Sequence, residues 1–229
     1  MKKLVVLTGA GVSAESGLKT FRDADGLWEG HRVEEVATPD AWERNPSLVL
    51  QFYNERRQQL SKALPNLAHR LLAELEKHFK VSIVTQNVDD LHERAGSSQV
   101  IHLHGELKKM RSERYSHLVY DCPGDILLGD LCEKGFQLRP HIVWFGESVP
   151  LLALAVPEFE SADICIIVGT SLQVYPAAGL IGYLPTSCRT YYIDPRPHPS
   201  YEIGLLNNIS LISKKAQEGM KEVFDRITS

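Results

Sequence analysis

The chain is poor in cysteine and has no Cys-x-x-Cys pair, the usual half of a structural zinc site. Its four cysteines are Cys122, Cys132, Cys165 and Cys188. Cys165 and Cys188 lie in apolar, strand-like runs, and cysteines in such runs are usually core residues. Four cysteines in 229 residues also argue against a fold that is held together by disulfides.

An excess of positive charge is missing as well. The 25 Lys and Arg residues are outnumbered by 29 Asp and Glu residues, which gives a net charge of −4. Nucleic-acid-binding proteins usually carry a basic face, so this balance argues against a nucleic-acid partner. No apolar run approaches the roughly 20 residues that span a bilayer, so we expect no membrane partner. We interpret the apolar run at 4–7 as a buried strand rather than a signal peptide, which makes the cytoplasm the expected location.

What the chain does contain is short, β-rich apolar runs that alternate with longer helical patterns. This alternation predicts an α/β fold, a Rossmann-like parallel sheet with helices on both faces. The predicted strands are 3–8, 81–85, 99–102, 141–144, 163–168, 188–193 and 209–212. The predicted helices are 11–17, 47–62, 66–79, 87–94, 151–160, 176–184 and 214–227.

Two stretches interrupt this alternation, and we predict that these insertions form a smaller lobe. Residues 30–78 have helical patterns but no clear strand, and residues 108–137 are polar and irregular. The predicted domains are therefore 1–29, 79–107 and 138–229 for the Rossmann-like part, and 30–78 and 108–137 for the small part.

A turn of small residues follows the first predicted strand. Gly9 and Gly11, with Ala14 after them, fit a dinucleotide-binding turn, in which small residues let the backbone approach a pyrophosphate. Glycines also close strands for purely steric reasons, so a structural turn stays open as the alternative. Asp194, at the end of the run 191–193, is the best candidate for binding a ribose hydroxyl.

A cluster of polar residues follows the predicted strand at 81–85, where ligand sites of open α/β sheets lie. The cluster contains Gln86, Asn87 and Asp89. A role as helix cap would explain Asn87 alone but not its two neighbours. We therefore predict a ligand site at this loop.

Two histidines end the next predicted strand. His102 and His104 point the same way if this strand runs from 99 to 103. A His-x-His pair can bind a metal, but no nearby set of cysteines or carboxylates completes such a site. His104, beside Gly105, is placed for acid–base chemistry near neutral pH, although an isolated histidine is more often structural.

These motifs and several others, in their order along the chain, resemble sirtuins. The resemblance is carried by Gly9-Ala10-Gly11-Val12-Ser13, Thr20-Phe21-Arg22, Gly26-Leu27-Trp28, Thr85-Gln86-Asn87-Val88-Asp89, His104-Gly105, Val143-Trp144-Phe145-Gly146-Glu147 and Gly169-Thr170-Ser171-Leu172. It spans nearly the whole chain and is greatest to bacterial sirtuins of the class that includes mitochondrial desuccinylases.

The resemblance implies NAD as co-substrate and three groups of functional residues. The implied catalytic residues are His104, Asn87 and Asp89. The implied NAD-binding residues are Gly9, Ala10, Gly11, Ser13, Ala14, Phe21, Arg22, Trp28, Gln86, Asn87, Asp89, His104, Gly169, Thr170, Ser171, Asp194 and Ala216. The implied substrate-binding residues are Ala37, Tyr53, Arg56, Val143, Phe145, Gly146 and Glu147. The last four would pair with an extended peptide that carries the acylated lysine.

The implied reaction removes an acyl group from a protein lysine. The acyl carbonyl oxygen attacks the nicotinamide ribose as nicotinamide leaves, and His104 acts as general base on the ribose hydroxyls. Water then releases free lysine and O-acyl-ADP-ribose, while Phe21 shields the site from premature attack by water. Two alternatives on the same fold are an ADP-ribosyl transferase and a non-catalytic NAD sensor. Asn87, Asp89 and His104 argue against the sensor, since binding alone does not need this set.

Tyr53 and Arg56 suggest which acyl group is removed. They are three residues apart in the predicted helix 47–62 and so share one face, where a phenol and a guanidinium together suit a carboxylate. In the sirtuin class named above, the matching residues bind the carboxylate of succinyl- or malonyl-lysine, and Ala37 matches a small residue that leaves room. Arginine on a helix is more often a solvated surface residue, which is the alternative. The resemblance thus implies acidic acyl groups, with acetyl-lysine accepted too, and the pair argues against a transferase.

The chain departs from most sirtuins at their structural zinc site, which uses two Cys-x-x-Cys pairs. Ser112 and Tyr115 match the first pair, and the second keeps Cys132 but has Gly135 at the partner position. One thiolate, even with Cys122 or His117, does not make a four-coordinate site, so we expect no zinc. We predict that residues 108–137 pack instead around Tyr115, Leu118, Tyr120, Leu127, Leu128 and Leu131.

Overall fold

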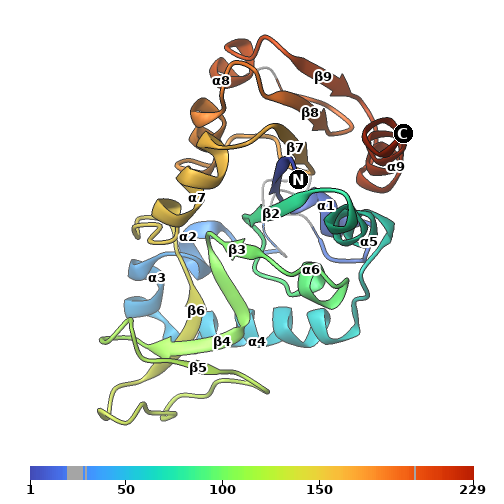
Figure 1. Cartoon of the computed structure of the whole chain (residues 1–229). Coiled ribbons are helices and arrows are strands. Elements are labelled where there is room, and N and C mark those ends of the chain that lie inside the picture. Colours follow the sequence, from blue (N-terminus) through green and yellow to red (C-terminus); the bar gives the residue numbers. More distant parts are fainter. Residues whose placement is uncertain (20–27, 29, 199) are drawn as a thin grey trace.

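The larger part of the molecule is built on a six-stranded sheet in the computed structural model, which describes residues 1–19, 28, 30–198 and 200–229 (Figure 1). The strands are β1 (Lys3–Thr8), β2 (Lys80–Thr85), β3 (Val100–His102), β7 (Ile164–Val168), β8 (Arg189–Ile193) and β9 (Ile209–Ile212). Their spatial order is β3-β2-β1-β7-β8-β9, and every neighbouring pair is parallel. This is the strand order of a Rossmann fold and confirms the predicted fold class.

Helices cover both faces of this sheet. Alternate side chains of each strand point to opposite faces, and both sets are apolar, so both faces need a cover. The covering elements are α5 (Leu67–Glu74), its 3₁₀ extension η1 (Leu75–Lys77), α9 (Ala216–Thr228), α7 (Leu152–Glu160) and the 3₁₀ helix η2 (Ala177–Tyr183). Val6 and Ile83 pack in one cluster with α5 and α9, whereas Leu7 and Val84 pack in another with α7 and η2. Both faces are therefore apolar, and burying one such aliphatic side chain stabilises the fold by roughly 1.5–3 kcal/mol.

A three-stranded sheet and a group of helices form the smaller lobe, drawn below the large sheet in Figure 1. Its elements are α2 (Val33–Val36), α3 (Pro39–Arg44), α4 (Pro46–Lys62), β4 (Gly105–Ser112), β5 (Val119–Asp121) and β6 (Leu138–Ile142). β4 is the middle strand and is antiparallel to both neighbours. The long helix α4 begins where the Asn45 side chain accepts a hydrogen bond from Leu48 N at 3.1 Å and Pro46 takes the first helical position.

The smaller sheet corrects two sequence predictions. The sequence predicts a strand of the parallel sheet at 141–144, but β6 ends at Ile142 and pairs with β4 instead. The sequence also predicts irregular structure for 108–137, whereas β4 and β5 pair there as antiparallel strands. The strand was not recognisable in the sequence, because Lys108, Lys109 and Arg111 are charged and lie at its partly exposed positions.

The packing predicted for 108–137 is partly wrong. Leu127, Leu128 and Leu131 are 62%, 54% and 56% exposed, so they do not form its core. Leu118 and Tyr120 do pack, partly buried, against the apolar cluster of the smaller lobe. The buried apolar residues of the segment are Cys122, Ile126 and Cys132.

The domain limits remain a prediction, and two elements, α5 and β6, suggest changes to them. This helix falls inside 30–78, yet its Ala68 and Leu72 pack in the cluster of the six-stranded sheet. β6 falls inside 138–229 but belongs to the smaller sheet. We therefore propose that the helical part of the small domain ends after α4 and that its sheet part extends through β6.

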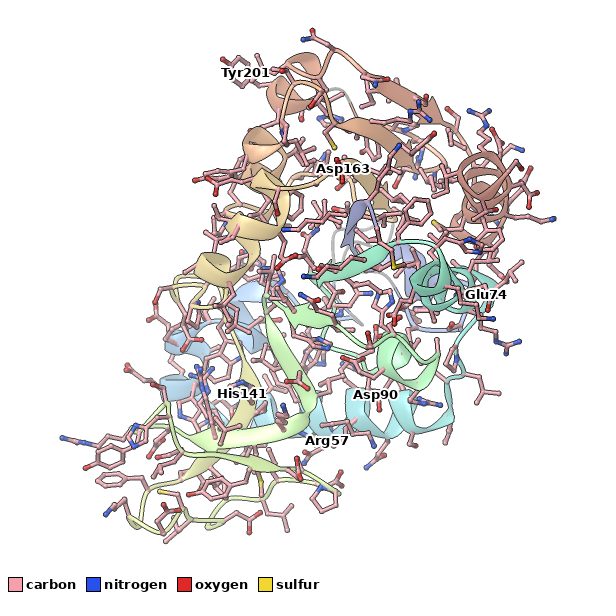
Figure 2. All side chains as sticks on the ribbon, viewed as in Figure 1. Arg57, Glu74, Asp90, His141, Asp163 and Tyr201 are labelled. Atoms are coloured by element: carbon pink, nitrogen blue, oxygen red, sulfur yellow. The ribbon has the colours of Figure 1, made fainter. Side chains whose placement is uncertain are left out.

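Other elements differ at their ends. α1 (Gly11–Ala14) and α6 (Leu91–Arg94) are shorter than the predicted 11–17 and 87–94, which leaves 86–90 as a loop. α8 (Tyr201–Gly204) was not predicted, and Figure 2 shows Tyr201 at the outer edge of the molecule. Cys165 and Cys188 are buried in the core, as predicted. Within the described ranges, no helix has both the length and the apolar character needed to cross a membrane.

Candidate active site

One cavity of about 600 Å³ lies at the carboxyl ends of the central strands and continues to α4 and β6 of the smaller lobe. It brings together the predicted residues Gly9, Ala10, Gly11, Ser13, Trp28, Ala37, Tyr53, Arg56, Gln86, Asn87, Asp89, His104, Val143, Phe145, Gly146, Glu147, Gly169, Thr170, Ser171 and Asp194. Two predicted residues of the described part do not line it: Ala14 is exposed on α1, and Ala216 is buried at the start of α9. Phe21 and Arg22 lie outside the described residues.

Some lining residues were not predicted. Gln173 and Tyr175 follow β7, and Arg196 and His198 follow β8. Their position just after strand ends was a usable signal, because ligands of such sheets bind there. Gln59 of α4 was not recognisable in this way, since it lines the cavity only because α4 packs across it.

The glycines of the first turn are required by the contact between two loops. Gly11 N donates a hydrogen bond to Gly169 O at 2.8 Å, so the loops after β1 and β7 touch backbone to backbone. A Cβ at Gly11 would lie 2.7 Å from Gly169 Cα, and a Cβ at Gly169 would lie 2.2 Å from Val12 N. Gly169 also has a φ of 67°, which favours glycine. The glycines are therefore needed for the steric fit of the two loops, and both loops still present their backbone to the cavity.

The loop after β2 is fixed by a buried hydrogen-bond network. Ser13 Oγ donates to Asp89 Oδ2 at 2.9 Å and accepts from Asn87 Nδ2 at 3.1 Å. Gln86 Nε2 donates to Thr170 Oγ1 at 3.0 Å, which ties this loop to the loop after β7. Asn87 does not cap α6, whose N-cap residue is Asp90, so the capping alternative is wrong. Burial raises the pKa of Asp89, while the hydrogen bonds from Leu91 N and Ser13 oppose that rise.

His104 has one ring nitrogen that can act as a base. Its Nδ1 lies 2.9 Å from Gln86 O, and because a carbonyl oxygen only accepts, Nδ1 must carry the hydrogen. The lone pair is then on Nε2. Burial lowers the pKa of His104, and the bond to Gln86 only partly offsets this effect. The imidazole is therefore neutral near pH 7 and ready to take a proton.

His102 has a different environment, although the sequence predicts that it points the same way as His104. β3 ends at His102, so His104 is outside the strand and the alternation does not reach it. His102 Nε2 lies 2.6 Å from Glu93 Oε1, and Nδ1 lies 3.2 Å from Asn87 O. Both partners are acceptors, so both nitrogens carry hydrogen and the ring is an imidazolium. His102 is buried beneath the loop after β2 rather than in the cavity.

The far end of the cavity holds the predicted acyl-binding residues. Tyr53 and Arg56 of α4 are only 0% and 8% exposed, so Arg56 is not the solvated surface arginine that the alternative required. The Arg56 guanidinium lies 4.3 Å from the centre of the Phe52 ring, and its Nη2 is 3.4 Å from Glu55 Oε2. Ala37 is 2% exposed and lines the same cavity. A buried phenol and a buried guanidinium thus share one compartment.

The segment 143–147 is held by bonds within the protein. Val143 N donates to His104 O at 2.9 Å, and Phe145 N donates to Ala37 O at 3.0 Å, so these two N–H groups do not face a peptide. The Glu147 carboxylate accepts from Arg139 Nη1 at 2.7 Å and from Arg111 Nη2 at 3.1 Å. Both arginines lower the pKa of Glu147 against the opposing effect of burial. The Glu147 side chain therefore stabilises this segment.

Asp194 lies at the other end of the cavity, directly after β8. Its Oδ1 accepts from Arg196 N at 2.8 Å, and burial raises its pKa. Asp194 lines the cavity, and its binding of a ribose hydroxyl remains a prediction.

The positions that match zinc ligands pack against one another. Cys132 Sγ donates to Ser112 Oγ at 3.4 Å, and Tyr115 N donates to the same oxygen at 3.2 Å. The Tyr115 ring packs edge-on against Phe136 with 5.5 Å between ring centres. The Cys122 thiol has a different partner and donates to Gly124 O. The described residues contain no group of three or more His, Cys, Asp or Glu side chains that could hold a metal ion.

Comparison with known proteins identifies the family. Residues 9–176 match the Sir2 family. The chain is 55% identical over 227 residues to an NAD-dependent protein deacylase of Helicobacter pylori, covering 99% of this chain and 98% of that one. A relative of the same name from Bacteroides thetaiotaomicron is 53% identical, with 97% of each chain covered.

Solved structures agree with this match. A Sir2 homologue in complex with NAD is 42% identical, with a TM-score of 0.87 and coverage of 99% of this chain and 90% of that chain. A mutant Sir2 homologue in complex with 2′-O-acetyl ADP ribose is 40% identical, with a TM-score of 0.87 and coverage of 99% and 92%. The chain belongs to the Sir2 family.

Proposed function

We propose that this NAD-dependent protein deacylase removes acidic acyl groups, succinyl and malonyl, from protein lysines and accepts acetyl-lysine as well. The observation that carries the proposal is that Tyr53 and Arg56 are buried side by side on α4 and line the same cavity as His104. The Arg56 guanidinium has Glu55 at one edge, and its planar donors match the geometry of a second carboxylate that enters the cavity. A neutral acetyl group makes no use of this pair.

The rest of the cavity fits NAD. The loops that carry Gly9, Gly11 and Gly169 line it without side chains at these positions, so a pyrophosphate can approach the backbone closely. Asp194 at one end suits a ribose hydroxyl, and Asn87 and Asp89 near the middle suit the nicotinamide ribose and the amide. Bound NAD supplies the ribose carbon that accepts the acyl oxygen. A cavity of about 600 Å³ is within the usual range for a ligand of this kind.

His104 is the proposed base. Its neutral Nε2 takes a proton from a ribose hydroxyl, while Nδ1 stays bound to Gln86 O and keeps the ring oriented. Ser13 holds Asn87 and Asp89 in place by two hydrogen bonds, so they bind rather than transfer protons. The proposed products are nicotinamide, O-acyl-ADP-ribose and free lysine, a product class supported by the complex of the related Sir2 homologue with 2′-O-acetyl ADP ribose.

The proposed partner is an acylated lysine in an extended peptide segment, with neither nucleic acid nor membrane involved. The exposed Phe145 and the turn at Gly146 border the cavity, so a peptide lying along them can insert its lysine. Because the Val143 and Phe145 N–H groups are bonded internally, the peptide would meet other groups of this segment. Glu147 contributes by holding the segment rather than by touching substrate.

The first test is direct. The protein is incubated with NAD and matched succinyl-, malonyl- and acetyl-lysine peptides, and peptide mass and free nicotinamide are followed. Loss of the acyl mass together with release of nicotinamide supports the deacylase. Added ADP-ribose mass would indicate a transferase, and NAD binding without turnover would indicate a sensor; either result refutes the proposal.

The second test addresses the acyl preference. Arg56→Met should reduce kcat/KM for the succinyl peptide by roughly ten- to a hundredfold, the value of a charge-assisted hydrogen bond pair, and change the acetyl value little. Arg70→Met, on an exposed arginine of α5, is the matched control and should leave both values unchanged. An unchanged ratio of succinyl to acetyl activity in Arg56→Met would refute the acidic preference.

A further inference from the structure

We propose that Trp144 is a positioning residue for acyl specificity, whose indole N–H turns the Tyr53 hydroxyl hydrogen toward the acyl carboxylate. The inference rests on the proposed preference for acidic acyl groups. It adds a third residue to the Tyr53–Arg56 pair. In this arrangement the Tyr53 hydroxyl is already oriented before the substrate binds.

The direction of the hydroxyl follows from one hydrogen bond. Trp144 Nε1 lies 3.1 Å from Tyr53 Oη, and both side chains are buried. Indole nitrogen only donates, so the phenol oxygen must accept, and its own hydrogen points elsewhere. In the part of the chain that the structure describes, no hydrogen bond from Tyr53 Oη to a protein acceptor is found. Both residues line the cavity, so an acyl carboxylate there is a suitable acceptor.

Accepting a hydrogen bond also makes the phenol a better donor. In a chain of hydrogen bonds each bond polarises the next, and the effect is larger where water is excluded. Burial raises the pKa of Tyr53, so the hydroxyl keeps its hydrogen at any pH at which the enzyme works. The Tyr53 hydroxyl is therefore a fixed neutral donor beside the Arg56 cation.

The indole is held by Arg139, which does not line the cavity, and by Glu147. The Arg139 guanidinium lies 3.2 Å from the centre of the Trp144 ring and is bonded to Glu147 at 2.7 Å. Glu147 Oε2 in turn accepts from the Trp144 backbone N at 2.8 Å. These contacts fix both the ring plane and the backbone of Trp144. They explain why Glu147, which the sequence assigns to substrate, has its carboxylate turned toward two arginines.

A pair of variants separates the N–H group from the bulk of the indole. Nε2 of an imidazole occupies the same place in the five-membered ring as Nε1 of an indole, so Trp144→His keeps a donor there and Trp144→Phe does not. Both lose the outer ring. We measure the succinyl-to-acetyl ratio of kcat/KM at pH 8, where an imidazole is neutral. The ratio does not depend on how much of the sample is folded, so a partly unfolded variant still gives an answer.

We expect Trp144→Phe to lower the ratio about five- to tenfold, the usual value of one hydrogen bond, and Trp144→His to lower it less. Equal ratios in the two variants, or no change in either, would overturn the proposal, because the indole would then act through its bulk or not at all. Trp42→Phe is the control: Trp42 is a buried neighbour 5.8 Å from Trp144 whose Nε1 donates to Glu113, and its loss should leave the ratio unchanged.

The Tyr53→Phe background distinguishes this inference from the function on which it rests. Tyr53→Phe alone should lower the ratio, and adding Trp144→Phe should then change it less than twofold, because the indole acts through the lost hydroxyl. If the second change has the same effect in both backgrounds, the positioning role of Trp144 is refuted and the acidic preference stands. If Tyr53→Phe and Arg56→Met both leave the ratio unchanged, the acidic preference itself is refuted.

Discussion

His102 and His104 are two residues apart, and their hydrogen-bond partners give them different charge states. His102 lies between two acceptors, Asn87 O and Glu93, and is held as a cation; the Glu93 carboxylate raises its pKa against the lowering effect of burial. His104 has a single carbonyl partner and is held neutral. The His102 cation lowers the pKa of Asp89, which opposes the rise caused by burial. The end of β3 thus carries a cation, His102, that supports the loop after β2, and the base His104 follows two residues later.

The pH dependence of turnover should report His104. Burial places its folded pKa below the ordinary value of 6.5, and the base works only when unprotonated. We expect kcat/KM to show no protonation of this group between pH 6.5 and 8 and to fall about tenfold per unit below its pKa. His104→Ala should reduce kcat by roughly a hundredfold or more. His78→Ala, at an exposed histidine, should leave the profile unchanged, whereas an acid limb centred above pH 6.5 would contradict the assignment.

At the scale of elements, the parts that could be predicted from the sequence were the polar loops that directly follow apolar strands. Gln86, Asn87 and Asp89 were recognisable because they follow a continuous apolar run, and β2 does end at Thr85. β4 and β5 were not recognisable, because their side chains are charged or half exposed and the pairing is what stabilises them. Leu127 was misjudged for a related reason: an apolar residue signals burial only when a partner surface exists, and here none covers it in the described part of the chain.

Asn54 is the residue by which α4 holds the segment after β5. Its Nδ2 donates to Ile126 O at 2.9 Å, its Oδ1 accepts from Ile126 N at 3.0 Å, and Arg57, labelled in Figure 2, donates to the same Oδ1 at 2.7 Å. Asn54→Ala would leave buried backbone and guanidinium groups without partners, so the free energy of unfolding should fall by roughly 2–4 kcal/mol in urea titrations. Gln51→Ala, on the exposed side of α4, is the control and should cost less than about 0.5 kcal/mol. A loss for Asn54→Ala as small as that would contradict the assignment.

At the scale of the whole molecule, the site depends on contacts that no local pattern contains. Phe145 N donates to Ala37 O, and Trp144 donates to Tyr53, so segments about a hundred residues apart form the acyl end of the cavity. The resemblance to sirtuins indicated which residues lie together in the site, and the pattern of apolar runs predicted the sheet. Neither revealed that the Glu147 carboxylate is bound by two arginines or that the first-turn glycines are required by Gly169. These depend on packing between elements.

The lobe that carries zinc in most sirtuins should fold here without metal. A structural zinc site contributes on the order of 10 kcal/mol to folding, so its loss requires other contacts. The chain supplies a buried bond between Cys132 and Ser112, an aromatic pair of Tyr115 with Phe136, and the Arg114 guanidinium 5.3 Å from the Phe136 ring centre. Because these contacts need no cation, treatment with a strong chelator should leave the Tm and the deacylase activity unchanged. Elemental analysis should find far less than one zinc per purified chain, and one full equivalent, lost together with stability on chelation, would show that the lobe still depends on metal.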